Sequence, residues 1–342
     1  MTPEMMIVAE GVTKRYGQTI ALAGIDLEVP AGSVLGVLGP NGAGKTTAVR
    51  ILTTLSLPDS GRAFVAGHNV VTEAQAVRRQ IGVAAQDATL DDLLTGRQNL
   101  QMIGELSRLS RAQARVRATE LLEQFELTDA ADRVMKGYSG GMRRRLDLAA
   151  SMVTRPPVLF LDEPTTGLDP ASRQRTWGVI RELTGSGVTL LLTTQYLEEA
   201  DGLADRIVVV DHGRVIANGT SRELKGAIGG ARLEVTLTEA HPGAAAALQP
   251  LVEGRVHVDP DGRRLHATVG NDTGVATAVV RALDVAGVLV DDVAVHQPSL
   301  DDVFFALTGT AGDRDAEPGK PDHDYPAQGG DAPAPELDGA VR

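Results

Sequence analysis

The sequence predicts an α/β protein in which helices flank a parallel sheet, followed by a small α+β domain and a disordered tail. Four short runs rich in Val, Leu and Ile recur along the first part of the chain: Val34–Leu38, Val158–Leu161, Thr189–Thr193 and Ile207–Val210. Continuous apolar runs of this length are typical of strands that are covered on both faces of a sheet. A glycine-rich loop follows the first run, and two adjacent carboxylates follow the second.

The segments between these strands read as helices and a hairpin. Residues Leu90–Phe125 carry Arg and Glu between apolar positions, so a helical subdomain is expected over about residues 87–150, inside a first domain of residues 1–225. Gly213 lies between Ile207–Val210 and Arg214–Ala217, and a glycine there predicts a tight turn. The first domain is therefore expected to close with a β-hairpin.

Glycines around Gly226–Gly230 predict a linker to a second domain over residues 226–309. The elements after the linker follow the order strand, helix, strand, strand, helix, strand, and a final helix, which is typical of a ferredoxin-like domain. They are Arg232–Thr238, Gly243–Leu251, Arg255–Val258, Arg264–Val269, Thr273–Ala286, Asp292–His296 and Leu300–Leu307. Residues 310–342 are rich in Pro, Gly, Asp and Ala, so a disordered tail is expected.

The composition disfavours several classes of function. The 45 acidic residues outnumber 33 basic ones, and a net charge of -12 disfavours nonspecific binding of nucleic acid, which needs a basic surface. The absence of cysteine excludes disulfides, thiolate metal sites and cysteine nucleophiles. The apolar runs are far shorter than the roughly 20 residues of a membrane span. Any action at a membrane is therefore expected to need another protein.

Residues 39–47 satisfy the phosphate-loop pattern G-x-x-x-x-G-K-[ST], between an apolar strand and a helical run. In such a loop the glycines let backbone N–H groups surround a phosphate, and the helix N-terminus adds its positive end. Lys45 is expected to reach the β- and γ-phosphates of ATP, and the Thr46 hydroxyl to bind Mg²⁺. The predicted ATP-binding residues here are Gly39, Pro40, Asn41, Gly42, Ala43, Gly44, Lys45, Thr46 and Thr47.

Two adjacent carboxylates, Asp162 and Glu163, end the apolar run that begins at Val158. Because the chain turns at the end of a strand, both side chains can approach one phosphate group. Asp162 is expected to hold the Mg²⁺ shell, as in other phosphate-loop ATPases. Glu163 is then the candidate that orients and polarises the attacking water.

Residues 138–142 read Tyr-Ser-Gly-Gly-Met and lie directly before a helical run. Here the sequence resembles the ABC ATPases, whose signature is L-S-G-G-Q before a helix. The resemblance implies that Ser139, Gly140 and Gly141 form a second anion cradle, which closes over the nucleotide of a second subunit. Tyr138 and Met142 depart from the signature, but neither departure removes the residues that supply the phosphate contacts.

Further positions match the pattern of this family. Tyr16 lies where an aromatic ring usually stacks on adenine. Gln86 lies at the Q-loop, which joins the Mg²⁺ site to the surface that contacts the membrane subunit. Asp169 lies in a segment that resembles the D-loop, whose aspartate acts across the dimer.

ABC ATPases usually carry a histidine after the strand that follows the D-loop, and this chain has Gln195 instead. A glutamine amide can donate a neutral hydrogen bond to the γ-phosphate but cannot titrate. We therefore expect Glu163 to act as the base and Gln195 only to sense the γ-phosphate. Among the other polar groups, no histidine has metal-ligand spacing, and Arg143–Arg145 is expected to line a solvated helix face.

Two segments narrow the resemblance to the daunorubicin/doxorubicin resistance ATP-binding proteins. They are Thr-Thr-Gln-Tyr-Leu-Glu-Glu-Ala-Asp at 193–201 and Gln-Pro-Ser-Leu-Asp-Asp-Val-Phe-Phe-Ala-Leu-Thr-Gly at 297–309. The resemblance implies a homodimer at the cytoplasmic face of the cell membrane that drives a separately encoded integral membrane permease. The implied cargo is an amphipathic drug such as an anthracycline, or a lipid, which contacts the permease and is exported.

Three other classes of phosphate-loop protein fit the sequence less well. A chromosome-maintenance or DNA-repair ABC ATPase needs a long coiled coil, and no sustained heptads separate Lys45 from Asp162. A nucleotide kinase has no reason to carry the Ser-Gly-Gly signature. A translation-factor-like ABC protein carries two phosphate loops, whereas this chain has one. A non-transport ABC ATPase that acts on nucleic acid or a protein complex remains the alternative function.

Overall fold

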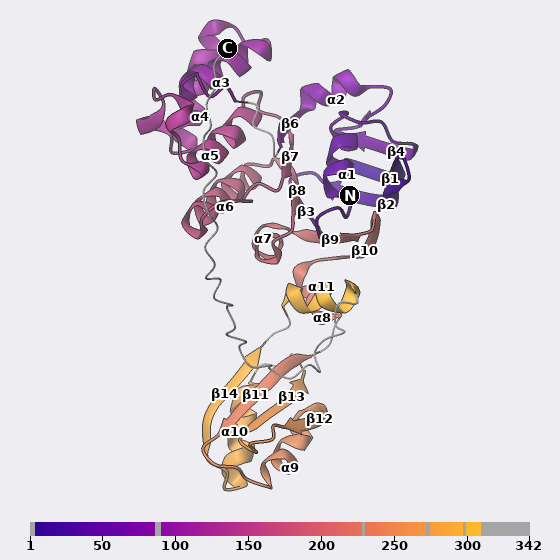
Figure 1. Ribbon diagram of the computed structural model, residues 1–342, viewed down its shortest axis with the longest axis vertical. Helices are drawn as coiled ribbons and strands as arrows, with labels where there is room; N and C mark the ends of the chain where they lie inside the picture. The colour runs from indigo at the N-terminus through magenta and orange to yellow at the C-terminus, as the bar shows by residue number, and fades with distance from the viewer. Residues whose placement is uncertain (1–3, 86–89, 228–229, 271–273, 297–298, 309–342) are drawn as a thin grey trace, which may run out of the picture.

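The computed structural model describes residues 4–85, 90–227, 230–270, 274–296 and 299–308 (Figure 1). Its central sheet has six strands in the order β10-β9-β3-β8-β7-β6. Strands β9 to β6 run parallel, and β10 closes the sheet as the antiparallel partner of β9. The bounds are β3 Val34–Leu38, β6 Ile81–Ala84, β7 Val158–Asp162, β8 Thr189–Thr194, β9 Arg206–Asp211 and β10 Arg214–Gly219.

The four predicted parallel strands and the terminal hairpin are confirmed. Every residue of β3, β7 and β8 is buried, as expected for strands that are covered on both faces. Gly213 adopts φ 73° in the turn between β9 and β10, a conformation that favours glycine.

A second, antiparallel sheet was not predicted from the sequence. Its strands are β1 Met5–Tyr16, β2 Thr19–Pro30, β4 Ser60–Val65 and β5 His68–Asn69, in the order β2-β1-β4-β5. Helix α1 (Lys45–Leu52) lies beside it (Figure 1). Ile7 and Leu27 of this sheet share one hydrophobic cluster with Ile51 of α1 and Phe160 of β7. The phosphate-loop helix is thus held by both sheets.

The predicted helical stretch over Leu90–Phe125 is divided into two helices, α3 (Gly96–Leu106) and α4 (Arg111–Gln124). Each begins with a capping box, in which the N-cap hydroxyl and a glutamine side chain satisfy each other's backbone N–H. The caps are Thr95 and Ser110. These two helices pack with α5 (Gly140–Ser151) to form the lobe at the upper left of Figure 1.

The remaining helices of this part of the chain connect its strands. The bounds are α2 Ala74–Gln80, α6 Pro170–Gly185, α7 Leu197–Leu203 and α8 Ser221–Gly226, with short 3-10 turns at Thr128–Ala130 and Met135–Gly137.

The third sheet has the strand order β12-β13-β11-β14, and all of its pairs are antiparallel. With one helix in each crossover this is the ferredoxin-like arrangement that the sequence predicts. The bounds are β11 Ala231–Leu237, α9 Ala244–Leu248, a 3-10 turn at Gln249–Leu251, β12 Glu253–Val258, β13 Arg264–Val269, α10 Val275–Val285 and β14 Val290–His296. The tail over residues 310–342 lies outside the described residues.

The last helix, α11 (Leu300–Thr308), does not pack on the third sheet. It returns to the first part of the chain and contacts α7 and α8 (Figure 1). Leu300 and Val303 join the hydrophobic cluster that contains Leu38, Ala200 and Leu224. Leu38 is the last residue of β3 and precedes the glycine-rich loop, so α11 packs on the layer that supports this loop.

Candidate active site

The loop between β3 and α1 has a backbone that only glycine tolerates at several positions. Gly42 and Gly44 have φ values of 83° and 110°. A Cβ on Gly39 would lie 2.2 Å from the carbonyl oxygen of Val210, and one on Gly44 would lie 2.4 Å from that of Ala21. Residues 39–47 therefore form a tight loop at the N-terminus of α1, as the phosphate-loop pattern predicts.

Lys45 is the first residue of α1 and is only 4% exposed. Its Nζ donates hydrogen bonds to the carbonyl oxygens of Gly39 (2.8 Å) and Pro40 (3.1 Å). The same ammonium lies 3.4 Å from Oε1 of Glu163. The loop thus encloses a buried cation, which faces the carboxylate at the end of β7.

Asp162, the last residue of β7, is 3% exposed and has two hydroxyl donors. Its Oδ1 accepts hydrogen bonds from Thr193 Oγ1 (2.5 Å) and Thr46 Oγ1 (3.3 Å). Mg²⁺ binds carboxylate and hydroxyl oxygens and usually takes its other ligands from phosphates and water. Within the described residues, no group of three or more His, Cys, Asp or Glu side chains could hold a metal. The Asp162 carboxylate and the Thr46 hydroxyl are oxygen donors of the kind that Mg²⁺ binds.

Glu163 adopts φ 50°, which is uncommon for a residue other than glycine and costs roughly 1–3 kcal/mol. Several hydrogen bonds hold the turn. Its N–H donates to the carbonyl oxygen and the hydroxyl of Thr193 (3.0 and 3.1 Å), and its Oε2 accepts from Thr166 Oγ1 (3.2 Å). This strained turn points the carboxylate at Lys45.

Of three further predicted residues, the structure describes Gln195 and Tyr16, and the third lies outside the described residues. Gln195 directly follows β8, the neighbour of β7, and is half-buried at the same edge of the sheet. Tyr16 ends β1 and is 48% exposed, with Lys14 Nζ 5.5 Å from its ring centroid. Gln86 is the residue of which the structure gives no description.

Ser139, Gly140 and Gly141 begin α5 and are not brought to the phosphate loop of the same chain. Ser139 caps the helix by accepting from the Met142 N–H (3.3 Å), and Ser139 and Gly140 are exposed. Their nearest neighbours lie around α6: a Cβ on Gly141 would lie 2.6 Å from Ser172 Oγ, and one on Gly140 would lie 3.9 Å from Leu168. The cradle thus faces outward.

Tyr138, which replaces the leucine of the signature, is buried and donates a hydrogen bond to the carbonyl oxygen of Ala130 (2.6 Å). Burial raises the pKa of its hydroxyl. Tyr138 therefore anchors the loop before α5. Asp169 caps α6 by accepting from the Ser172 N–H (2.9 Å), and hydrogen bonds from Ser172 lower the pKa of this exposed carboxyl.

The expectation that Arg143–Arg145 lines a solvated helix face is wrong for two of the three residues. The side chains of Arg144 and Arg145 are each 13% exposed, and both donate to backbone carbonyls. Arg143 is the most exposed of the three, with 35% of its side chain exposed, and makes an ion pair with Asp92. A run of charges alone cannot reveal this, because burial of a guanidinium depends on acceptors that come from distant segments.

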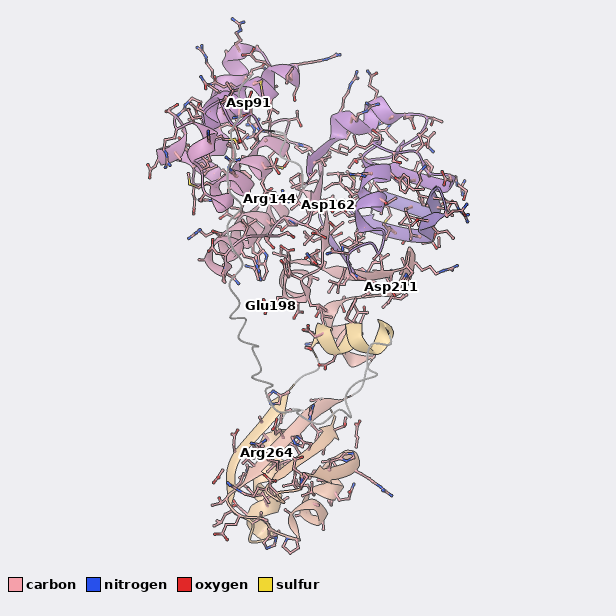
Figure 2. The ribbon with its side chains drawn as sticks, in the orientation of Figure 1. Asp91, Arg144, Asp162, Glu198, Asp211 and Arg264 are labelled. Carbon is pink, nitrogen blue, oxygen red and sulfur yellow. The ribbon has the colours of Figure 1, made fainter. Side chains whose placement is uncertain are left out.

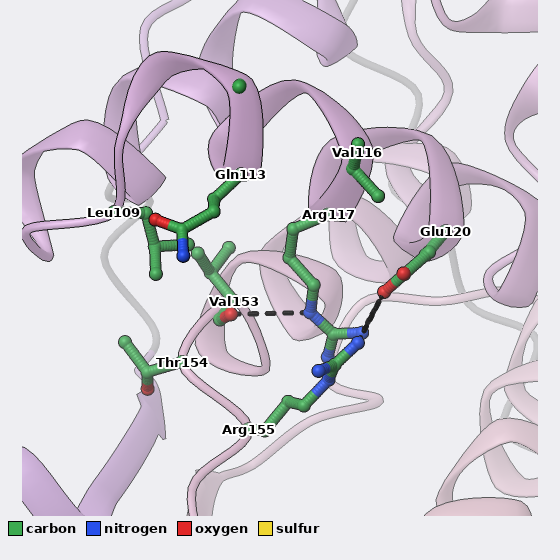
Figure 3. A pocket seen from close by; sticks show the side chains of 9 residues that line it. Leu109, Gln113, Val116, Arg117, Glu120, Val153, Thr154 and Arg155 are labelled. Atoms are coloured by element: carbon green, nitrogen blue, oxygen red, sulfur yellow. Dashed lines mark hydrogen bonds and ion pairs between the residues drawn. The ribbon is translucent and has the colours of Figure 1, made fainter.

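A hollow of about 410 Å³ lies elsewhere, against α4 and the segment after α5 (Figure 3). Arg117 crosses it, donating to the carbonyl oxygen of Val153 and to Glu120. None of the predicted site residues lines this hollow. The predicted site residues that the structure brings together lie instead at the carboxyl edge of the central sheet.

Sequence comparison finds related proteins that align with most of this chain. Residues 22–166 match the family described as ABC transporter. A daunorubicin resistance ATP-binding protein of Streptomyces coeruleorubidus is 58% identical, over 89% of this chain and 96% of that protein. The daunorubicin/doxorubicin resistance ATP-binding protein of Streptomyces peucetius is 50% identical, over 92% and 96%. A Nod factor export ATP-binding protein of Ralstonia nicotianae is 38% identical, over 89% and 94%.

Solved structures match the part of the chain that holds the site. A dimeric bacterial ABC transporter cassette aligns with a TM-score of 0.58 at 27% identity, covering 63% of this chain and 98% of its own. A dimeric cassette bound to ADP and phosphate after hydrolysis aligns with a TM-score of 0.58 at 26% identity and the same coverage.

Proposed function

This chain belongs to the ATP-hydrolysing subunits of ABC transporters, and we propose that it drives export of an amphipathic drug or lipid through a separate membrane permease. The proposed direction and cargo are supported by the names of its relatives, which are drug-resistance or export proteins at 38–58% identity. None of the relatives named here supports the alternative of an ABC ATPase that acts on nucleic acid.

The proposed mechanism rests on the grouping of four side chains at one edge of the central sheet. Lys45 Nζ lies 3.4 Å from Glu163 Oε1, and Thr46 Oγ1 donates a hydrogen bond to Asp162 Oδ1 (3.3 Å). When ATP enters the loop, Lys45 exchanges its carbonyl acceptors for the β- and γ-phosphate oxygens. Glu163 accepts a hydrogen bond from the attacking water, aligns it with the γ-phosphate and takes its proton. The Gln195 amide donates to a γ-phosphate oxygen.

Thr46 and Asp162 would hold Mg²⁺, together with Gln86. The ion, when bound, neutralises charge on the phosphate oxygens. Tyr16 would stack on the adenine ring, which its 48% exposure permits. These roles follow from the position of each residue in the family's pattern.

The complete catalytic site is proposed to need two copies of the chain. Ser139 and Gly140 are exposed at the N-terminus of α5, where backbone N–H groups and the helix dipole attract phosphate, yet they face away from their own loop. A two-fold dimer would place this cradle, and Asp169, over the nucleotide of the other copy. The dimeric cassettes among the structural matches support this arrangement.

The membrane partner is proposed to be a separate protein. In the part of the chain that the structure describes, no helix combines the length and hydrophobicity of a membrane span. We therefore infer a peripheral subunit at the cytoplasmic face of the cell membrane, beside a permease that contacts the cargo.

Efflux of a fluorescent anthracycline tests the whole proposal. The chain is co-expressed with a candidate permease, a membrane protein with about six apolar spans, and cellular doxorubicin is measured. The pair should lower steady-state drug content, and Lys45→Ala should abolish the effect at equal protein levels. Equal drug content in cells with the parent chain and with Lys45→Ala would reject drug as the cargo.

A further inference from the structure

We propose that Arg144 is a positioning residue for ATP hydrolysis, which fixes the turn that carries Glu163 to helix α5, the helix whose first residues face the second copy. The proposal rests on the proposed roles of Glu163 and Ser139. It adds a physical connection within one chain between the cradle for the partner's nucleotide and the carboxylate of the chain's own site.

The Arg144 guanidinium joins four acceptors from three segments. Nε donates to the carbonyl oxygen of Pro164 (2.6 Å), and Nη2 donates to that of Asp162 (3.1 Å). Nη1 donates to the carbonyl oxygen of Ala85 (2.8 Å) and to Asp147 Oδ2 (3.0 Å). Figure 2 shows Arg144 beside Asp162, where α5 meets the end of β7. Four of the five guanidinium N–H groups are thereby used.

Two of these acceptors bracket Glu163. The carbonyls of Asp162 and Pro164 belong to the residues on either side of it, and Glu163 itself has the strained φ of 50°. A residue in this region keeps its conformation only when its surroundings over-determine it. Arg144 therefore supplies part of the force that keeps the carboxylate directed at Lys45.

The other end of the connection is the signature helix. Arg144 lies five residues after Ser139, in the second turn of α5. A shift of the helix N-terminus when it meets a phosphate is transmitted through one rigid turn to the guanidinium. The bond to Ala85, the residue that follows β6, attaches the end of this strand to the same group. Closure of the dimer would thus act on Glu163 through Arg144.

Arginine is required here because of its shape. A lysine ammonium carries its donors on one atom and cannot span acceptors on three segments, whereas the planar guanidinium can. Arg145 offers a matched control on the same helix. It is equally buried and also donates to carbonyls, those of Phe125 and Glu126, but these lie within the helical lobe.

The competing explanation is that Arg144 only neutralises Asp147, which is buried beside it. In that case removing both charges together restores the protein, because removal of a buried pair avoids an unpaired charge. The double variant Arg144→Met with Asp147→Asn separates the two explanations. Asp147→Asn alone keeps an oxygen acceptor for Nη1.

The test compares steady-state kcat and KM for ATP, together with the melting temperature, in the full-length variants. Asp147→Asn and Arg145→Met should keep kcat within about threefold of the parent. The double variant should lose at least about tenfold in kcat relative to Asp147→Asn, with KM changed less than about threefold, because misplacement of a catalytic group by 1 Å costs up to 10²-fold. Arg144→Lys, which keeps the charge and the pair, should lose kcat similarly.

A double variant with less than tenfold loss relative to Asp147→Asn would overturn the proposal, as would equal kcat losses in Arg145→Met and Arg144→Lys. These outcomes differ from those that would refute ATP hydrolysis itself. In that case the parent chain does not hydrolyse ATP, or Glu163→Gln retains full turnover.

Discussion

At the scale of single residues, the site is a set of buried charges that compensate one another. Lys45 and Glu163 are 4% and 8% exposed, and Asp162 is satisfied by two threonine hydroxyls. Such an arrangement is stable without ligand and provides new partners for phosphate when ATP arrives. Each side chain should therefore contribute to a separate step.

Substitutions test whether Glu163 acts as the base while Gln195 only donates a hydrogen bond to the γ-phosphate. Glu163→Gln should lower kcat on the order of 10²–10⁴-fold, since the base is lost, whereas Gln195→Ala should cost only about tenfold, the loss of one neutral hydrogen bond. ATP turnover by phosphate release measures both. Losses of several orders of magnitude for both variants would refute this division of roles.

Asp147 gives a prediction for the dependence of stability on pH. Burial raises the pKa of its carboxyl from 3.8 to about 6, although Arg144 acts in the opposite direction. The native state therefore binds this proton more tightly than the unfolded chain, and its contribution to stability is present below about pH 4 and lost as pH rises through 6. The loss amounts to on the order of 3 kcal/mol.

Asp147→Asn removes this titration. Its free energy of unfolding relative to the parent should rise between pH 4 and pH 7, as measured by urea unfolding at each pH. A parallel pH dependence for the two proteins would show that Asp147 does not titrate in this range.

Site residues were predicted correctly where they belong to short contiguous sequence motifs. The spacing of residues 39–47 and the pair Asp162-Glu163 predict a loop and carboxylates that the structure brings together. The burial of Arg144 was missed, because three of its four acceptors, the carbonyl oxygens of Ala85, Asp162 and Pro164, come from segments that are distant in sequence.

At the scale of elements, four of the five parallel strands were predicted, whereas β6 and the antiparallel sheet were not. Continuous apolar runs identify β3, β7 and β8. Strands β1 and β2 instead mix exposed and buried residues, and their pairing contains register shifts, for example between Ala9 and Val12. Bulges interrupt the two-residue alternation by which half-buried strands are recognised.

Helix α11 is the element whose position has the clearest energetic consequence. Leu300 and Val303 are 3% and 2% exposed in their cluster against α7 and α8. Replacing both by Ala should cost about 2–5 kcal/mol, largely as release of α11. Hydrogen exchange should accelerate in α7 and α8, whereas Val285→Ala, at a side chain that is 91% exposed, should change nothing. Unchanged exchange in the double variant would show that α11 does not stabilise these helices.

At the scale of the whole molecule, the chain carries the parts of a nucleotide site on two surfaces. The phosphate loop and the carboxylates lie together, whereas Ser139 and Gly140 are exposed at the N-terminus of α5. No local sequence pattern indicates that the signature lies apart from the phosphate loop of its own chain. Only the resemblance to ABC ATPases predicted this separation. The geometry makes sense if two copies exchange their cradles.

Light scattering on Glu163→Gln tests this central claim most directly, since slow hydrolysis should trap the closed state. With saturating ATP and Mg²⁺ the mass should rise from that of one chain, 35.9 kDa, to that of two. Adding Ser139→Arg should prevent the rise while each chain still binds ATP, and adding Ser107→Arg, on an exposed turn, should not. A Glu163→Gln protein that stays monomeric, or a dimer that survives Ser139→Arg, would contradict the shared site.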